Sequence, residues 1–105
     1  MSITRYTCRV RGNALAPRFE HNEWILVDPE HEPARGDEVL IVLNNGLRLV
    51  RELVARGTGA VTVRPIGGQL AAETLNADVI ERVDYICGSA GHYILGFAHG
   101  PEVRV

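Results

Sequence analysis

Apolar and polar positions along this chain follow the two-residue period of β-strands. Residues 6–10 alternate between the two kinds, and the apolar run at 24–27 stops at Asp28-Pro29. Alternation predicts strands with one buried face, and short apolar runs between turn residues predict fully buried strands. Strands are therefore expected at residues 6–10, 24–27, 39–43, 47–53, 61–64, 79–87 and, near the end of the chain, 93–97. One short helix is expected at residues 69–75.

The dipeptide Asn45-Gly46 separates two of these strands and predicts a hairpin. Both residue types tolerate positive φ, as a two-residue type I′ turn requires. Such a turn would place Leu40 opposite Arg51 and Val42 opposite Leu49. The residues expected on one face with Arg51 are then Leu40, Val42, Leu49 and Leu53.

A guanidinium on an apolar face needs a partner or a path to water, because burying it alone is costly. Two arrangements of Arg51 are open. In the first it pairs with an acid or a loop carbonyl, the candidate acids being Asp37, Glu38 and Glu20. In the second the strand lies near a sheet rim and the side chain extends into solvent.

Length and composition suit one all-β domain over residues 1–105. Of the 105 residues, 46% are hydrophobic, enough for a core. Many short strands predict several short coiled sheets with a partly open barrel. No apolar run approaches the ~18 residues of a membrane span. The formal net charge of -2 gives no basic surface for nucleic acid.

The chain has two cysteines, Cys8 and Cys87. Two cysteines do not make a disulfide framework. Both lie in strand-like apolar segments, so we expect two buried thiols in a reducing cytoplasm. They would pair only if the first and last strands were neighbours.

The chain contains no lysine, so its 11 Lys and Arg residues are all arginines. This restricts the chemistry open to it. A neutral lysine can take a proton, whereas a guanidinium has a pKa above ~12 and stays charged. No lysine base can act anywhere in this chain.

Four segments follow one another in a specific order. They are Gly12-Asn13-Ala14-Leu15-Ala16-Pro17, Ile25-Leu26-Val27-Asp28-Pro29, Gly36-Asp37-Glu38-Val39 and Leu49-Val50-Arg51-Glu52-Leu53. Together they resemble the C-terminal domain of the LexA and lambda-type phage repressors, a family of self-cleaving peptidases distantly related to signal peptidases. The family pattern has Gly-x-Ser-Met-x-Pro, a strand ending near Val-Asp, a Gly-Asp turn and Val-Lys-Arg-Leu. The resemblance covers residues 6–88 and implies the LexA/signal-peptidase-like fold.

The resemblance also implies a serine–lysine dyad with both members replaced. Ala14 stands where the family has its nucleophilic serine, and Arg51 where it has the lysine base. In the family the neutral lysine takes the serine proton, and the alkoxide attacks a peptide bond of the same chain. An alanine methyl has no proton to lose. Ala14 and Arg51 are therefore expected to be vestigial dyad positions, with no catalytic residue.

A relocated nucleophile is the alternative that keeps an active peptidase. Ser89 and His92 are the closest serine–histidine pair. Ser89 lies between glycine and alanine residues typical of a turn, so a turn residue is the more common interpretation. The histidines lack metal-ligand spacing, and neither metal nor cofactor is expected.

The resemblance implies a non-cleaving oligomerisation and regulatory domain of a phage-type transcriptional repressor. In the family this domain forms homodimers or higher oligomers, which tether two DNA-binding heads. No helix-turn-helix is recognisable here, so DNA would be reached only through a separate domain. Tyr93, Leu95 and Phe97 should lie on one side of the last strand, either covering the core or forming an oligomer interface.

Two further functions remain open. A stand-alone β-barrel module could hold a peptide in the vestigial cleft, which would then have to stay open. Alternatively, a free-standing domain could form mixed dimers with complete repressors and act as an anti-repressor.

Overall fold

The computed structural model describes residues 4–67 and 71–105, and this part of the chain is nearly all β. One 3-10 turn, η1 (Ala77–Val79), is the only helical segment of the described residues. The strands are β1 (Tyr6–Arg11), β2 (Trp24–Asp28), β3 (Glu38–Leu43), β4 (Arg48–Arg56), β5 (Ala60–Arg64), β6 (Glu73–Asn76), β7 (Ile80–Ala90), β8 (Ala98–His99) and β9 (Val103–Arg104). The predicted all-β class is confirmed. No helix of the described residues is long and apolar enough to cross a membrane.

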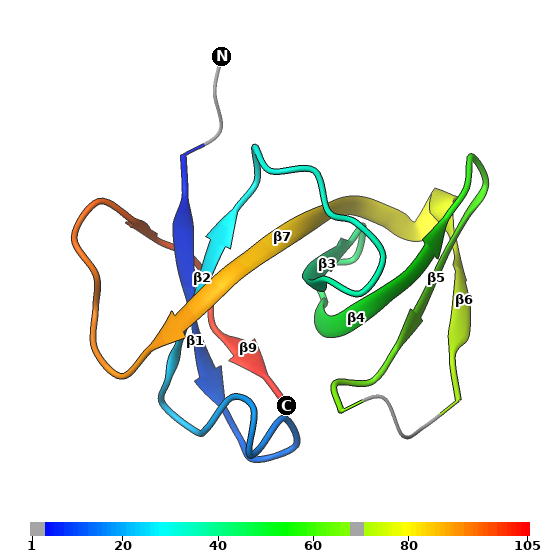
Figure 1. The fold of residues 1–105 in the computed structure, drawn as a ribbon. Coiled ribbons are helices and arrows are strands. Elements are labelled where there is room, and N and C mark those ends of the chain that lie inside the picture. Colours follow the sequence, from blue (N-terminus) through cyan, green and yellow to red (C-terminus); the bar gives the residue numbers. More distant parts are fainter. Residues whose placement is uncertain (1–3, 68–70) are drawn as a thin grey trace.

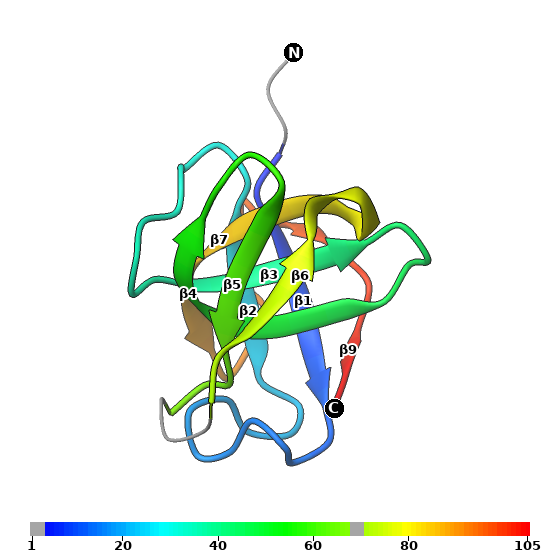
Figure 2. The ribbon, with the colours of Figure 1, turned by 90° about the vertical axis from the view of Figure 1, so that its right-hand side faces the viewer.

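The strands form one coiled sheet with the order β6-β5-β4-β3-β7-β2-β1-β8, and β9 pairs with β1. The long strand β7 runs diagonally across the molecule, with β1, β2 and β9 to one side and β4, β5 and β6 to the other (Figure 1). A view turned by 90° has β5 and β6 in front of β1 and β9 (Figure 2). The sheet coils on itself without closing, so the molecule has two halves joined by β7.

Each half has its own hydrophobic cluster. The first cluster consists of Cys8, Val10, Leu15, Phe19, Ile25, Val27, Leu40, Val42, Val50, Ile86 and Val103. The second consists of Val39, Ile41, Leu53, Val61, Val63 and Val83. Successive residues of β3 alternate between the two clusters, because side chains of a strand point alternately to its two faces. This explains why residues 39–42 are all apolar: both faces of β3 are buried.

The hairpin between β3 and β4 differs from the prediction by one residue. Its loop has three residues: the Leu43 amide donates to the Leu47 carbonyl at 2.9 Å, and the Gly46 amide to the Leu43 carbonyl at 2.9 Å. Gly46, at φ 90°, is the residue with positive φ in this loop. A type I turn followed by such a glycine makes a three-residue hairpin loop. The predicted two-residue type I′ turn is therefore wrong.

The extra loop residue moves Arg51 to the other face. Arg51 is paired with Val39, and Leu40 with Val50. A one-residue change of register reverses every side chain of a strand. Arg51 thus shares its face with Leu53 of the second cluster and with Leu49, which packs against that cluster, and not with Leu40 and Val42 as predicted.

Two other segments also differ from the predictions. Glu73–Asn76 is strand β6, so the helix expected at 69–75 is wrong there, and residues 69 and 70 lie outside the described residues. Residues 93–97 contain a turn and no strand, and the strand of this region is β8. The Ala98 amide donates to the Arg5 carbonyl at 2.8 Å, and the Gly100 amide donates to the Thr7 carbonyl in β1 at 2.8 Å.

Candidate functional site

The loop after β1 positions Ala14 at the surface and Leu15 in the core. Gly12 has φ 119°, and its amide donates to His21 Nδ1 at 2.9 Å. The Phe19 amide donates to the Leu15 carbonyl at 3.1 Å, which holds both side chains in the first cluster. The chain therefore turns tightly, with Leu15 buried and Ala14 exposed beside it.

The last residues of the chain pack against the start of this loop. The Val105 amide donates to the Arg11 carbonyl at 2.9 Å. A Cβ on Gly12 would lie 1.8 Å from the Val105 carbonyl oxygen, so no other residue fits there without displacing backbone. Strand β9 is parallel to β1 and extends this contact, with Val103 buried in the first cluster.

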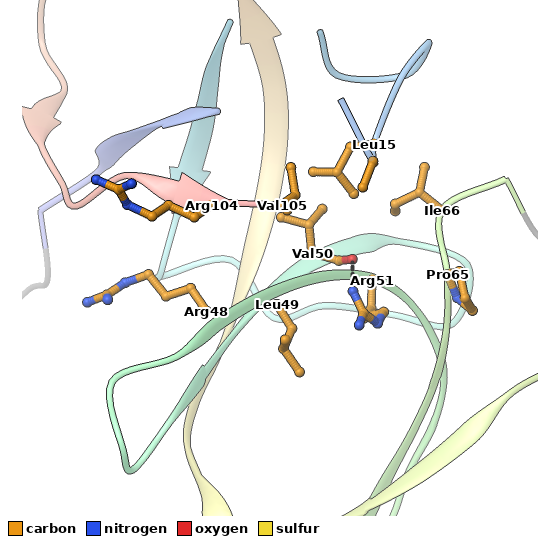
Figure 3. Close-up of a pocket in the computed structure, with 10 residues that line it drawn as sticks. Leu15, Arg48, Leu49, Val50, Arg51, Pro65, Ile66, Arg104 and Val105 are labelled. Carbon is orange, nitrogen blue, oxygen red and sulfur yellow. Dashed lines mark hydrogen bonds between the residues drawn. The ribbon is translucent and has the colours of Figure 1, made fainter. Parts of the chain in front are cut away.

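Ala14 and Arg51 line one cavity. It has a volume of about 330 Å³ and lies between the loop after β1, strand β4, residues 65–66 and the end of the chain (Figure 3). Its lining consists of Ala14, Leu15, Arg48, Leu49, Val50, Arg51, Pro65, Ile66, Arg104 and Val105. The two positions singled out by the sequence, 37 residues apart, are brought to the same place. The cavity also remains open, although Leu15 and Val105 form part of its wall.

The charged side chains that line this cavity are all arginines. Arg48, Arg51 and Arg104 line it, and none of its ten lining residues is an acid. In the close-up, Arg48 and Arg104 lie on one side with their side chains directed the same way, and Arg51 lies beneath Val50 (Figure 3). Arg48 and Arg104 also line a smaller adjoining cavity of about 170 Å³.

Arg51 is only partly satisfied. Its Nη1 donates to the Val50 carbonyl at 2.9 Å, and its Nε lies 3.6 Å from Glu73 Oε1. The Nε is buried and has no hydrogen-bond partner. Buried polar atoms without partners are uncommon in folded proteins. The side chain as a whole is 25% exposed, so it is neither fully paired nor free in water.

None of the acids predicted to pair with Arg51 does so. Glu38 forms a bidentate pair with Arg18 at 2.7 and 2.8 Å, and Asp37 accepts from the Ala34 amide at 2.8 Å. The carboxylate nearest to Arg51, Glu73, is on strand β6, which the sequence does not signal as a strand. Arg48 and Arg104 were also missed, because nothing in the local pattern links residues 48 and 104.

The alternative nucleophile lies elsewhere. Ser89 belongs to strand β7, opposite Ile25, so its predicted place in a turn is wrong. Neither Ser89 nor His92 lines the cavity. No group of three or more His, Cys, Asp or Glu residues in the described ranges is arranged to hold a metal ion.

The tail residues predicted to form an interface do not share one environment. Tyr93 stacks on His99 with ring centroids 4.3 Å apart, and its hydroxyl donates to the Phe97 carbonyl. Phe97 lies under the guanidinium of Arg5 at 5.0 Å. Leu95 is 89% exposed at the tip of this segment. Two of the three side chains therefore pack on the molecule, and Leu95 extends away from it.

A second polar centre lies beside the first cluster, against which Tyr6 packs. The Tyr6 hydroxyl donates to Asp84 Oδ2 at 2.6 Å, and Arg82 Nε donates to the same oxygen at 3.0 Å. Asp84 is 3% exposed. Burial, with the hydrogen bond to Asp84, raises the pKa of Tyr6 above its ordinary value. All three side chains of this centre have charged or hydroxyl partners.

The two cysteines are unpaired and lie in different environments. Burial raises the pKa of the Cys8 thiol to about 12. Cys87 is exposed, so the prediction of a buried thiol is wrong for it, and its Sγ lies 3.4 Å from the Leu26 carbonyl. Strand β2 lies between β1 and β7, which explains why the two thiols do not meet.

The comparison with known families agrees with this geometry. A model described as Peptidase S24-like matches residues 4–89, most of the chain. The matched range includes Ala14 and Arg51. No curated protein matches the chain.

Proposed function

We propose a function from the premise that the chain belongs to the Peptidase S24-like family, the family of LexA and phage-repressor C-terminal domains. Within it, this domain is a pseudo-peptidase that serves assembly and regulation in a phage-type transcriptional repressor. DNA contacts belong to a separate helix-turn-helix domain.

The carrying observation is the cavity shared by Ala14 and Arg51. By resemblance these are the nucleophile and base positions of the family. A serine–lysine pair there would need the serine oxygen and a neutral amine. Alanine offers only a methyl group, and arginine keeps its proton. The loss of both partners supports a domain that keeps the family fold without self-cleavage.

Assembly gives such a domain a function that does not need the dyad. Linking two weak DNA-binding heads raises their joint affinity through effective concentration, without new contacts. The surface that supports this role is the exposed tip of the tail. Leu95 is 89% exposed, and Tyr93, two residues earlier in the chain, stacks on His99. We propose this tip as a contact between copies, because an exposed apolar side chain gains free energy when association removes it from water.

Sedimentation velocity on the purified chain tests this proposal. We expect a reversible dimer, which Leu95→Ser weakens at least about tenfold. Leu47→Ser is the matched control, because Leu47 is also exposed, at 58%, on the β3–β4 hairpin. The mass of the same samples after long incubation at alkaline pH should remain that of the intact chain.

Two outcomes would contradict the proposal. A strict monomer at high concentration removes the assembly role. A loss of intact mass that Ser89→Ala abolishes replaces the pseudo-peptidase with an active enzyme that uses a relocated nucleophile.

A further inference from the structure

The loop of the β3–β4 hairpin carries a chemically reactive dipeptide at the surface. Asn45 is followed by Gly46, and no other asparagine of the chain precedes a glycine. Residues 44–47 are all exposed, so water reaches them freely. The amide nitrogen that follows an asparagine can attack the side-chain Cγ, because both atoms belong to the same short segment of chain. A glycine in the next position favours this attack, since it has no Cβ beside the attacking nitrogen.

The loop bends the Asn45 side chain toward the residues that follow it. Asn45 Oδ1 accepts from the Leu47 amide at 3.0 Å, which is the hydrogen bond of an Asx turn. When a nucleophile adds to Cγ, negative charge develops on this oxygen. An amide that donates to the oxygen stabilises the charge, as the donors of an oxyanion hole do. The Leu47 amide is therefore in place before the reaction begins.

A guanidinium lies beside the attacking residue. Arg48 Nη1 donates to the Gly46 carbonyl at 2.9 Å. The Gly46 nitrogen attacks after it loses its proton, and a nearby positive charge stabilises the anion that forms. One contact opposes the reaction, because the Gly46 amide donates to the Leu43 carbonyl at 2.9 Å and must leave this acceptor. In an exposed loop water replaces the acceptor, so the loss costs little.

We propose that Asn45 is a site of spontaneous deamidation in the folded protein. The Gly46 nitrogen loses its proton to hydroxide and bonds to Asn45 Cγ. The side-chain nitrogen takes a proton from water and leaves as ammonia, which closes a cyclic imide. Water then opens the imide at either carbonyl and leaves aspartate or isoaspartate at position 45. The chain is not cut, so mass distinguishes the product from any cleaved chain.

The reaction changes both the charge and the length of the loop. Each reacted chain gains one negative charge beyond the formal net charge of -2. The new carboxylate lies close in the chain to Arg48, which takes part in none of the ion pairs of the described residues. Isoaspartate also adds one backbone atom to the loop that sets the register of β4. Asn45 does not line the cavity of Ala14 and Arg51, so this inference does not depend on the proposed function.

Peptide mass spectrometry of the folded chain after incubation tests the proposal. Asn76 is the internal comparison: its Oδ1 also accepts from the amide two residues on, that of Asp78, at 2.9 Å, but Ala77 follows it. We expect Asn45 to be lost at least about tenfold faster than Asn76, because a side chain hinders attack by the Ala77 nitrogen. The rate at Asn45 should rise about tenfold from pH 7 to pH 8, since hydroxide removes the amide proton.

Trypsin isolates the reacting segment. It releases residues 36–48, between the cleavage points after Arg35 and Arg48, and fragmentation of this peptide separates Asn45 from Asn44. A sample digested without incubation corrects for reaction during the digest. Equal loss at Asn45 and Asn76 would overturn the proposal. So would an Asn45 that reacts in urea but stays intact in the folded chain, because the loop would then protect it.

Two variants test the contributions of the loop. Asn45→Gln should give no product over the same time, because its side-chain carbonyl carbon lies one methylene further from the Gly46 nitrogen. Arg48→Gln should slow the reaction at least about threefold, since it removes the neighbouring charge. Arg56→Gln is the matched control on the same strand, because Arg56 lies 3.6 Å from Glu32, away from the loop. A rate in Arg48→Gln equal to that of Arg56→Gln, with both proteins folded by circular dichroism, would overturn the part assigned to the guanidinium.

Discussion

Two polar groups of this molecule lie against its core, and their surroundings differ. Asp84 is 3% exposed, and its Oδ2 accepts from Tyr6 and Arg82. Arg51 lies beside an open cavity, with a buried Nε that has no hydrogen-bond partner. The Asp84 centre joins strands β1 and β7, whereas Arg51 has one backbone acceptor and a distant carboxylate. A polar group that holds a fold together is satisfied within it, whereas one that is incompletely satisfied contributes less to the stability of the fold.

The largest expected effect comes from removing the satisfied group. Asp84→Ala leaves the Tyr6 hydroxyl and the Arg82 guanidinium without their shared acceptor. We expect the free energy of unfolding to fall by about 3 kcal/mol, because partners of a buried charge are left unmatched. Urea unfolding measures this. Glu32→Gln is the control, since Glu32 is 86% exposed and surface pairs contribute little. If the free energy of unfolding fell by less than about 1 kcal/mol, Asp84 would stabilise the fold no more than a surface charge does, and the contrast with Arg51 would be wrong.

Raising the pH is expected to lower the free energy of unfolding by a smaller amount. The groups responsible are Cys8 and Tyr6. The pKa of Cys8 is raised from 9.0 to about 12 by burial, and that of Tyr6 is raised from 10.0. At a pH between the ordinary pKa and the raised pKa of each group, the unfolded chain loses the proton and the folded chain keeps it. Stability is therefore fully present below pH 9 and falls as the pH rises toward 12, by at most about 1.4 kcal/mol per pH unit for each group.

The variant Cys8→Ala separates the thiol from the phenol. Its stability should fall less steeply over the same pH window, because only Tyr6 remains to titrate there. Denaturant midpoints at several pH values measure the slope. Cys87→Ala, at the exposed thiol, should change the slope less. An identical slope in wild type and Cys8→Ala would mean that Cys8 does not titrate above its usual range.

The smallest expected effect is at Arg51. Arg51→Met replaces a partly satisfied guanidinium with an apolar side chain of similar length, beside Leu49 and Leu53. We expect the free energy of unfolding to stay the same or to rise by up to about 1 kcal/mol. Thermal unfolding of the two proteins measures the difference. A loss of more than about 1 kcal/mol would show that Arg51 stabilises the fold as Asp84 does.

The alternation of apolar residues was enough to predict the all-β class and the main strands. It did not determine which way Arg51 faces, because that depends on which loop residue takes positive φ. Asn45-Gly46 fits a two-residue turn equally well in sequence, but in the fold Gly46 alone takes positive φ after Asn44-Asn45. A difference of one residue in loop length therefore determines on which face of β4 each side chain lies.

The contacts around the cavity could not be predicted from local sequence patterns, for a different reason. Arg104 reaches it through β9, a strand of two residues that is too short to show a period. Glu73 approaches Arg51 only because β6 pairs with β5. Tyr6 and Asp84 lie 78 positions apart and meet through the order of the sheet. The resemblance to a known family, and not any local pattern, assigns Ala14 and Arg51 to one site, and both line the same cavity.

Strand β7 has a consequence for how the molecule comes apart. It hydrogen-bonds to β2 on one edge and β3 on the other, and it contributes Ile86 to the first cluster and Val83 to the second. Neither half can release this strand without exposing the interior of the other. The amide protons of both halves should therefore exchange with solvent in one concerted opening, rather than as two independent subdomains.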